Sequence, residues 1–433
     1  MGYIMELSPK IYYEYDDVEK STIDFLARST DIENLRQYFS SEWDRYRTTK
    51  YCGVIGTQDI TVVVLPKVCR TESQNNDIDA AKRNSLQLLY MLNYAYELDL
   101  EAKVFKAMVE SLRMNIFEVF LREFADELTQ QVRMGMFHDY INIVENSTRL
   151  RGKYLILKDV TENFVPTKIY CSYDDFSIDN DLNRFFKYAI STFIIATSSD
   201  KIRRSLRMLQ PYFADVSSKF FPNSNEEFTF NRLNSNFKRA YKLARFILHH
   251  MIYTFQSNNR ISFSFMFDMN RLFEQFVERL VVETSPVNYR VQVQKTGKMG
   301  SASIRPDIVI QKRDNDEVSL VLDAKYKNPE YTSPCDRYQI YSYGMVFPRW
   351  VETDDETGLQ IRRVMLIYPK HLFSERTIQK EPEELWDGEH NETKVYMKKA
   401  VLDLSHESEN YKKYIETMKG RIRRILWNSM TKS

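Results

Sequence analysis

The sequence predicts a mixed fold of the α+β or α/β class, with a β-rich N-terminal module, a mainly helical middle and a C-terminal region of alternating elements. Three observations carry this prediction. Residues 1–75 contain β-branched runs, residues 82–260 show helical periodicity with a β insertion at about 130–175, and residues 261–433 follow the order α-β-β-β-α-β. We therefore expect several domains around more than one core.

Composition narrows the class further. The chain has 433 residues, 43% of them hydrophobic and only 11 of them glycine, which excludes collagen-like and largely disordered proteins. Basic and acidic residues number 61 and 60, so the net charge of +1 excludes a globally basic nucleic-acid coat. The four scattered cysteines form no CxxC pair. No apolar run is long enough to span a bilayer, and the N-terminus lacks a signal-peptide pattern. We expect a cytoplasmic protein with reduced thiols and no membrane segment.

The N-terminal module is expected to contain a hairpin. Residues 51–56 (YCGVIG) and 60–67 (ITVVVLPK) are short apolar runs, and Pro66 ends the second. The polar residues 70–82 are the best candidate for a linker.

The middle region is expected to be helical on both sides of its insertion. Apolar periodicity predicts helices over residues 86–98, 105–128, 182–197 and 237–255. Between them, alternating or β-branched segments predict strands at 140–144, 153–157 and 168–171. This β insertion, flanked by helices, is predicted to project from the domain.

The C-terminal region begins with an amphipathic helix over residues 269–281. Strands are expected at 289–293, 304–310 and 318–325, a helix at 336–346, and further strands at 364–368 and 394–402. A basic helix with one apolar face closes the chain.

Two of these strands carry a pattern that suits metal-dependent chemistry. Asp307 begins the run that follows Pro306, while Asp323 and Lys325 lie two positions apart and so share one face of the next strand. If the two strands pair, both carboxylates converge on one point. Carboxylate oxygens and water are the ligands that Mg²⁺ prefers, and a neighbouring lysine can orient an attacking water. The pattern favours phosphodiester hydrolysis, although either half alone is common on exposed strands and turns.

Pro306-Asp307 and Asp323-Ala-Lys325 together resemble the motif of the PD-(D/E)xK nuclease superfamily. The resemblance implies metal binding by Asp307 and Asp323, with Mn²⁺ as a possible substitute for Mg²⁺, and water orientation by Lys325. It also implies a third acidic ligand at Glu274, for which a solvated helix charge is the alternative. Gln339 and Tyr343 match the QxxxY motif of the RecB-like branch, with a simple i, i+4 surface pair as the alternative.

A wider set of segments resembles the McrC family, the nuclease subunits of McrBC modification-dependent restriction systems. The segments that carry the resemblance are NSLQLLYMLNYA at 84–95, LRGK at 150–153, NDLNR at 180–184, RPDI at 305–308, LDAKY at 322–326, YQIYSY at 338–343 and LIYP at 366–369. Residues 1–75 resemble the extra β-rich module of longer members.

The resemblance implies a DNA endonuclease that acts with a McrB-like hexameric AAA+ GTPase on double-stranded, modified DNA, for which methylated DNA is the expected form. The β insertion would enter the ring of that partner and stimulate GTP hydrolysis. Arg149, Arg151 and Lys153 are candidates for contacting the ring, with a solvated strand edge as the alternative. The chain has no GxxxxGK[ST] motif, so GTP is expected on the partner. Phosphate contacts are expected from basic residues around the motif, namely Lys295, Lys298, Lys325, Lys327 and Arg337.

Two other functions remain open at this point. One is a free-standing RecB-like DNA nuclease, and the other is a non-catalytic activator of an AAA+ ring. The complete Asp/Asp-x-Lys set argues against the activator, and the β insertion argues against the free-standing nuclease.

Overall fold

The computed structural model describes most of the chain. The described residues are 9–29, 35–42, 45–57, 60–67, 78–102, 104–105, 116–164, 167–218, 228–255, 261–299, 302–330, 332–347, 350, 352–353, 358–370, 382–390, 393–405 and 410–431. Two compact units divide the chain: Met1–Ile116 with Thr254–Ser433, and Phe117–Tyr253. The protein is therefore of mixed α/β class, with its strands and helices distributed over several sheets. The predicted boundaries near residues 75, 82 and 261 stay predictions.

The N-terminal part of the first unit contains two small sheets and a helix. Its elements are β1 (Lys10–Tyr13), β2 (Asp17–Val18), α1 (Lys20–Ser29), β3 (Phe39–Glu42), β4 (Arg45–Thr48), β5 (Tyr51–Thr57) and β6 (Thr61–Leu65). Strands β5 and β6 pair antiparallel, which confirms the predicted hairpin. One sheet has the order β2-β4-β3.

The other small sheet takes a strand from far along the chain. Strands β1, β6 and β5 are followed in its order by β11 (Ile261–Asp268), which pairs antiparallel with β5. The backbones approach closely at Gly53, where a Cβ atom would lie 2.1 Å from the carbonyl oxygen of Phe265. Only glycine fits there. Strand β11 runs directly into the helix that opens the C-terminal region.

Helix α3 (Ile78–Ala95) follows the N-terminal sheets. It contains residues 86–95 of the helix predicted at 86–98 and ends three residues earlier than predicted. It also begins earlier, so residues 78–82 are helical and not part of a linker. Its apolar residues are buried over almost every turn, which makes it a core helix of the first unit. Residues 70–77 lie outside the described residues.

The C-terminal part of the first unit is built on one larger sheet in the order β12-β15-β16-β18-β20-β19, with β17 on β18. Its strands are β12 (Tyr289–Val293), β15 (Ile308–Lys312), β16 (Val318–Ala324), β17 (Glu352–Thr353), β18 (Gln360–Pro369), β19 (Glu383–His390) and β20 (Thr393–Leu402). Strands β16, β18 and β20 run parallel, and the others pair antiparallel. The helices are α10 (Met269–Thr284), α11 (Pro334–Val346) and α12 (Tyr411–Thr431). Most of the C-terminal elements predicted from sequence are therefore confirmed.

The strand expected over residues 304–310 is interrupted. A short hairpin of β13 (Gly297–Met299) and β14 (Ala302–Ile304) ends at Ile304, and β15 begins only at Ile308. Pro306 has no N–H to donate, which explains the break between the two strands. Asp307 therefore sits in the break, immediately before β15.

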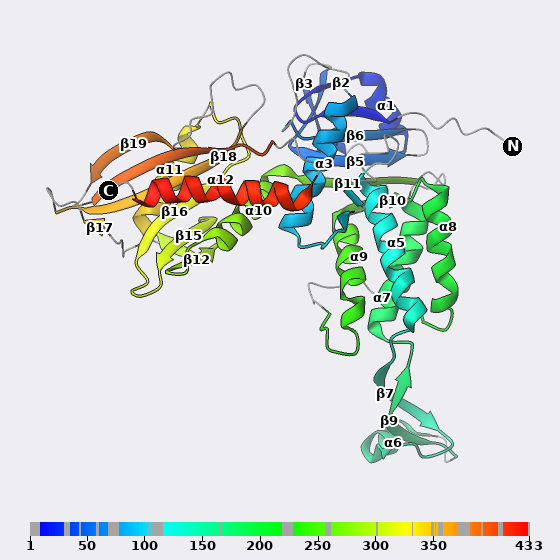
Figure 1. Cartoon of the computed structure of the whole chain (residues 1–433). Helices are drawn as coiled ribbons and strands as arrows, with labels where there is room; N and C mark the ends of the chain where they lie inside the picture. The colour runs from blue at the N-terminus through cyan, green and yellow to red at the C-terminus, as the bar shows by residue number, and fades with distance from the viewer. Residues whose placement is uncertain are drawn as a thin grey trace. The chain divides into compact units, whose positions relative to one another are not determined.

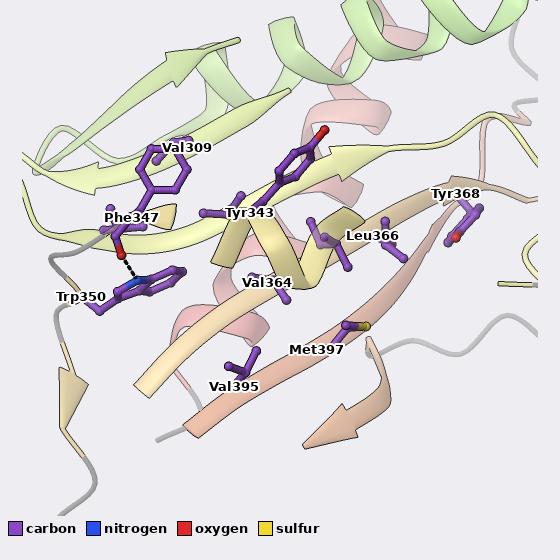
Figure 2. Close-up of a cluster of buried hydrophobic side chains, with 12 residues drawn as sticks. Val309, Tyr343, Phe347, Trp350, Val364, Leu366, Tyr368, Val395 and Met397 are labelled. Carbon is purple, nitrogen blue, oxygen red and sulfur yellow. Dashed lines mark hydrogen bonds between the residues drawn. The ribbon is translucent and has the colours of Figure 1, made fainter. Parts of the chain in front are cut away.

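One face of the larger sheet packs against α11. Figure 2 shows the buried side chains between them, where Val364, Leu366 and Tyr368 alternate along β18. Trp350 closes one end of this cluster, and its Nε1 donates a hydrogen bond to the carbonyl oxygen of Phe347 at 2.7 Å. Helices α10 and α12 lie side by side in the same unit (Figure 1), and Lys419 of α12 pairs with Glu283 of α10 at 3.0 Å.

Within its described residues, the second unit contains a group of longer helices and a projecting β element. The helices are α5 (Ile116–Met134), α7 (Asp181–Ala196), α8 (Asp200–Leu209) and α9 (Lys238–His250). The strands β7 (Asp139–Ser147) and β9 (Ile169–Ser177) pair antiparallel and extend from one end of the helices, as Figure 1 shows. At the far end they carry β8 (Lys153–Tyr154) and the short helix α6 (Ile156–Glu162). The predicted projecting insertion is thus present in this unit.

Two sequence predictions in this unit are wrong in part. The strand expected at 153–157 stops at Tyr154 and gives way to α6, because a short apolar run does not distinguish strand from helix. The helix expected at 237–255 ends at His250, and Met251–Phe255 forms strand β10. That segment, MIYTF, is rich in β-branched and aromatic residues. Among the described residues, no helix is both long enough and apolar enough to span a bilayer.

Candidate active site

Pairing of β15 with β16 brings Asp307 and Asp323 together. Ile308 lies opposite Leu322 in the antiparallel register, so the preceding Asp307 falls opposite Asp323. Asp307 Oδ2 accepts a hydrogen bond from the backbone N–H of Ala324 at 2.7 Å. The first carboxylate is therefore tied to the strand that carries the second.

Lys325 completes the group directly after β16. Its Nζ lies 2.7 Å from Asp323 Oδ2, and its backbone N–H donates to the carbonyl oxygen of Ile367 on β18 at 2.8 Å. The Asp323 side chain is only 2% exposed. Within the described part of the chain, Asp323 Oδ2 receives no hydrogen bond of regular geometry besides this ion pair. A buried carboxylate oxygen in this state is costly unless a cation or a proton meets it.

The pKa values of Asp307 and Asp323 are shifted because two like charges lie close together away from bulk solvent. Burial raises the pKa of Asp307, the charge of Asp323 raises it further, and the Ala324 N–H opposes both. Burial likewise raises the pKa of Asp323, against the opposing charge of Lys325. Burial alone would lower the pKa of Lys325, but the charges of Asp323 and Asp307 outweigh it and raise that pKa. The site therefore favours a bound proton or a bound cation.

Glu274 on α10 lies near this pair. It is partly buried. Burial raises its pKa, Lys325 opposes the rise and Asp323 adds to it. Among the described residues, however, no group of three or more His, Cys, Asp and Glu side chains is placed to hold a metal ion. Asp307 and Asp323 therefore form an acidic pair with Glu274 as its acidic neighbour, and metal binding by the three stays a prediction.

The backbone of Asp307 is anchored toward α10 as well. Its carbonyl oxygen accepts a hydrogen bond from the backbone N–H of Gln294 at 2.6 Å, and Gln294 has a left-handed backbone with φ of 49°. The Gln294 side chain hydrogen-bonds Glu278, one turn after Glu274, and burial raises the pKa of Glu278 to about 7. A strained residue thus lies between the helix and the carboxylate loop.

Gln339 and Tyr343 lie on α11 and contact one another. Gln339 Nε2 donates to the Tyr343 hydroxyl at 2.7 Å. Tyr343 is buried, and its pKa is raised by burial and by the charge of Asp323. The structure therefore brings Tyr343 toward the acidic pair and leaves Gln339 on its outer side.

The basic residues near the motif differ in their surroundings. Lys327 Nζ is held by both carboxylate oxygens of the buried Asp336, at 2.8 and 3.0 Å. Lys295 Nζ lies 5.5 Å from the ring centre of Phe347, and burial lowers its pKa. Arg337 is exposed on α11, and the side chain of Lys298 lies outside the described residues. Lys325 is the cation in direct contact with the acidic pair.

Arg149, Arg151 and Lys153 belong to the second unit: the two arginines precede β8, and Lys153 is its first residue. All three are exposed. The Arg151 guanidinium lies 5.4 Å from the ring centre of Tyr173, and its Nη1 donates to the Tyr173 hydroxyl at 3.3 Å. Gly152, between Arg151 and Lys153, has a φ of 63°, and a Cβ atom there would lie 2.5 Å from the carbonyl oxygen of Ser172. The RGK segment is thus a tight turn that presents basic side chains at the projecting end of the unit.

The sequence did not predict that residues of the N-terminal module contact the region around the Asp/Asp-x-Lys motif. Tyr326, next to Lys325, donates its hydroxyl proton to Glu14, which lies 312 positions away in the chain. Lys50 pairs with Asp268 at the start of α10 at 2.7 Å. No local pattern in the sequence signals contacts between positions so far apart.

The fold and the site define a mixed α/β protein in which one partly buried and one buried carboxylate lie at neighbouring strand ends beside a lysine. Its sequence matches the model of a family described as the McrBC 5-methylcytosine restriction system component, over residues 46–369. The match covers most of the chain, and the chain belongs to this family.

One solved structure has a similar fold over nearly the whole chain. A structure of Thermococcus gammatolerans McrB AAA+ hexamers with bound McrC contains a similar chain, with a TM-score of 0.61 and 20% identity, over 95% of this chain and 99% of that chain. A cryo-EM structure of the Thermococcus gammatolerans McrBC complex is similar over 64% of this chain and 88% of that chain, with a TM-score of 0.45 and 21% identity. No curated protein matches the sequence.

Proposed function

We propose that this protein is the Mg²⁺-dependent DNA endonuclease subunit of a McrBC-like restriction system. The observation that carries the proposal is the pair formed by the partly buried Asp307 and the buried Asp323, with Lys325 Nζ 2.7 Å from Asp323 Oδ2. Two converging carboxylates beside a lysine suit phosphodiester hydrolysis. Membership of the McrBC family supports a role in the restriction of DNA.

The order of elements around the pair supports a PD-(D/E)xK core. Helix α10, strands β12, β15 and β16, helix α11 and strand β18 follow one another in the order α-β-β-β-α-β, interrupted by the small hairpin β13–β14 and by β17. In this proposal Asp307 supplies the first acid of the motif, and Asp323 and Lys325 supply the second half.

The residues present fit a divalent cation. Asp323 Oδ2 is buried beside a second carboxylate, and hard oxygen donors suit Mg²⁺, with Mn²⁺ as a substitute. A cation held by Asp307 and Asp323, when bound, supplies charge stabilisation at the phosphoryl oxygens. Lys325 orients the attacking water and places positive charge next to the reacting phosphate. Tyr343 packs behind the pair and helps exclude bulk water. Glu274 adds negative charge and remains a possible further ligand.

The proposed partner is a McrB-like hexameric AAA+ GTPase, which would bind GTP. Support comes from the fold likeness to a chain in a structure of McrB AAA+ hexamers with bound McrC. Support also comes from the projecting β element of the second unit. Helix α6 at its end buries none of its own residues. Its neighbourhood exposes large apolar side chains: Ile156 60%, Leu157 85%, Val160 79% and Phe164 89%.

An exposed apolar patch beside basic side chains is typical of a protein interface. We propose that this end of the second unit contacts the ring, with Arg149, Arg151 and Lys153 at its margin. The substrate of the complex is proposed to be double-stranded, modified DNA, in line with the 5-methylcytosine system that the family description names.

The test is cleavage of methylated and unmethylated plasmid with Mg²⁺ and GTP, with and without a McrB-like AAA+ GTPase from the same organism. We expect cleavage only with the partner, and none by Asp323→Ala, which should still bind the partner and stimulate its GTP hydrolysis. Equal cleavage by the chain alone would point to a free-standing nuclease. Stimulated GTP hydrolysis without any cleavage would point to a non-catalytic activator, and cleavage that survives in Asp323→Ala would refute the site.

A further inference from the structure

The N-terminal module reaches the proposed nuclease site through one buried hydrogen bond. Tyr326 directly follows Lys325, and its hydroxyl donates to Glu14 Oε1 at 2.7 Å. Both side chains are buried: Tyr326 is 8% exposed and Glu14 is 2% exposed. Burying the Glu14 carboxylate costs free energy of desolvation. The hydrogen bond from the Tyr326 hydroxyl offsets part of that cost.

The acceptor is itself fixed within the N-terminal module. Glu14 Oε1 also accepts the backbone N–H of Lys67 at 2.8 Å, and the N–H of Glu14 donates to the carbonyl oxygen of Leu65 at 2.9 Å. Lys67 Nζ pairs with Asp16 Oδ1 at 2.8 Å and is itself buried. Glu14 is therefore held between the end of β1 and the end of β6 and offers Tyr326 an acceptor in a fixed place.

The same tyrosine also contacts α10. Its ring centre lies 5.7 Å from that of Phe273, the residue before Glu274. Tyr326 also directly follows Lys325 in the chain. One side chain thus contacts the N-terminal module, lies beside the lysine of the motif and packs against the helix that carries Glu274.

A second link reaches the start of α10. Lys50 Nζ pairs with Asp268 Oδ2 at 2.7 Å, and the Lys50 carbonyl oxygen accepts the N–H of Met269 at 3.1 Å. Asp268 caps α10 by accepting the N–H of Asn270 at 3.0 Å. The module therefore contacts both elements that frame the carboxylate pair.

We propose that Tyr326 is a positioning residue of the nuclease site, and that Glu14 of the N-terminal module fixes it there. This inference rests on the proposed function. It assigns a role to the N-terminal module: the module holds the end of β16, and with it Lys325, in the geometry that the reaction needs. Interactions of this kind behind ligands and catalytic groups typically change activity by about 10- to 100-fold.

The test compares substitutions that differ only in the hydrogen bond. Tyr326→Phe removes the hydroxyl and keeps the ring against Phe273. Glu14→Gln keeps an acceptor oxygen, whereas Glu14→Ala removes it. Tyr12→Phe is the matched control, because the Tyr12 hydroxyl bonds Thr22 within the N-terminal module at 2.9 Å.

Two readouts are needed on the full chain. The first is hydrogen exchange at the amides of Ala324, Lys325 and Lys327, which are bonded to Asp307 Oδ2, the Ile367 carbonyl and the Lys325 carbonyl. The second is plasmid cleavage with the AAA+ partner. Tyr326→Phe and Glu14→Ala should speed exchange at these amides and lower kcat about tenfold with little change in KM. Glu14→Gln should retain most activity, and Tyr12→Phe should match the wild type.

Unchanged exchange and unchanged kcat in Tyr326→Phe would overturn the inference, as would a loss in Glu14→Gln equal to that in Glu14→Ala. Wild type and Asp323→Ala are assayed alongside. If neither cleaves DNA, the proposed function fails, and the exchange measurement alone still decides whether the hydrogen bond orders the end of β16.

Discussion

The carboxylate of Asp307 accepts its hydrogen bond from the backbone N–H of Ala324, at 2.7 Å. Ala324 separates Asp323 from Lys325, so the first acid is bonded to the middle of the motif that supplies the other two groups. This hydrogen bond directly links the loop before β15 to the end of β16. A change in the backbone at Ala324 is therefore expected to displace Asp307, Asp323 and Lys325 together.

Divalent cations should stabilise the protein through the carboxylate pair. We expect the unfolding temperature to rise with Mg²⁺ or Mn²⁺, since a ligand present at 100 times its Kd adds about 2.7 kcal/mol to the free energy of unfolding. Asp307→Asn should abolish the rise and, without metal, should be at least as stable as wild type because a like-charge contact is removed. Thermal unfolding with and without a chelator measures both. Asp314→Asn, exposed on the turn between the same strands, is the control. A full metal response in Asp307→Asn would rule out this ligand.

Replacement of the motif lysine should affect the reaction much more than folding. Lys325→Met removes the ammonium next to Asp323 and keeps most of the side-chain volume. We expect cleavage by the assembled complex to fall about 100-fold or more, as for other groups that act directly on the reacting atoms. Lys312→Met, at the end of β15, should cleave at nearly the wild-type rate. Rates of plasmid cleavage measure the difference, and similar losses in the two variants would contradict a specific role for Lys325.

Glu14 should make stability fall as pH rises toward neutrality. Burial, opposed by hydrogen bonds from Lys67 and Tyr326, raises its pKa from 4.5 to about 7. The folded state then binds a proton that the unfolded state has released, so the stabilisation is full below 4.5 and is lost as pH rises through about 7. In Glu14→Gln this dependence disappears. The difference in unfolding free energy between wild type and variant should change by about 3 kcal/mol between about pH 4.5 and 8.

Urea unfolding at a series of pH values measures this difference. The groups that face Glu14 are Lys67, Tyr326, Asp16, Tyr15 and Cys52. Parallel curves for the two proteins across the range would contradict a protonated Glu14.

A buried carboxylate in the second unit should be important for stability. Glu118 of α5 accepts hydrogen bonds from the Thr197 hydroxyl at 2.7 Å and from the Ser198 N–H and hydroxyl at 2.8 Å each. These donors lie just before α8, so the carboxylate fixes the turn between α7 and α8. Glu118→Ala should lower the free energy of unfolding by about 2 kcal/mol, because the buried Thr197 hydroxyl and two part-buried donors of Ser198 lose their acceptor. Glu162→Ala, exposed at the end of α6, should change it by less than about 0.5 kcal/mol. Denaturant midpoints compare the two.

Much of the fold follows from local patterns in the sequence. The β-branched runs gave the β5–β6 hairpin, and the apolar spacing from Met269 onward gave α10. The convergence of Asp307 and Asp323 also follows from sequence, since two consecutive strands joined by a polar turn pair antiparallel. These predictions succeed because residues close in sequence determine them.

The features that sequence reasoning missed depend on distant residues. Strand β11 pairs with β5, more than two hundred positions earlier, and the Tyr326–Glu14 bond joins residues 312 apart. The structure has a strand from Met251 where a helix was predicted, and a helix from Ile156 where a strand was predicted. Both are short apolar segments that fit either structure. The roles of Glu274 and Gln339 depend on what binds at the site, so they stay predictions.

The path of β11 has a consequence for how such proteins exchange parts. This strand is an integral member of the N-terminal sheet, yet it leads without a break into α10 and Glu274. Its fit against β5 requires glycine at position 53, which lies opposite Met266 and close to the carbonyl oxygen of Phe265. A chimera that replaced only the first 67 residues with those of a relative would pair two strands of different ancestry at this contact. Functional recombinants between relatives are therefore expected to take residues 1–67 and 261–268 from the same parent, although the two segments lie far apart in the gene.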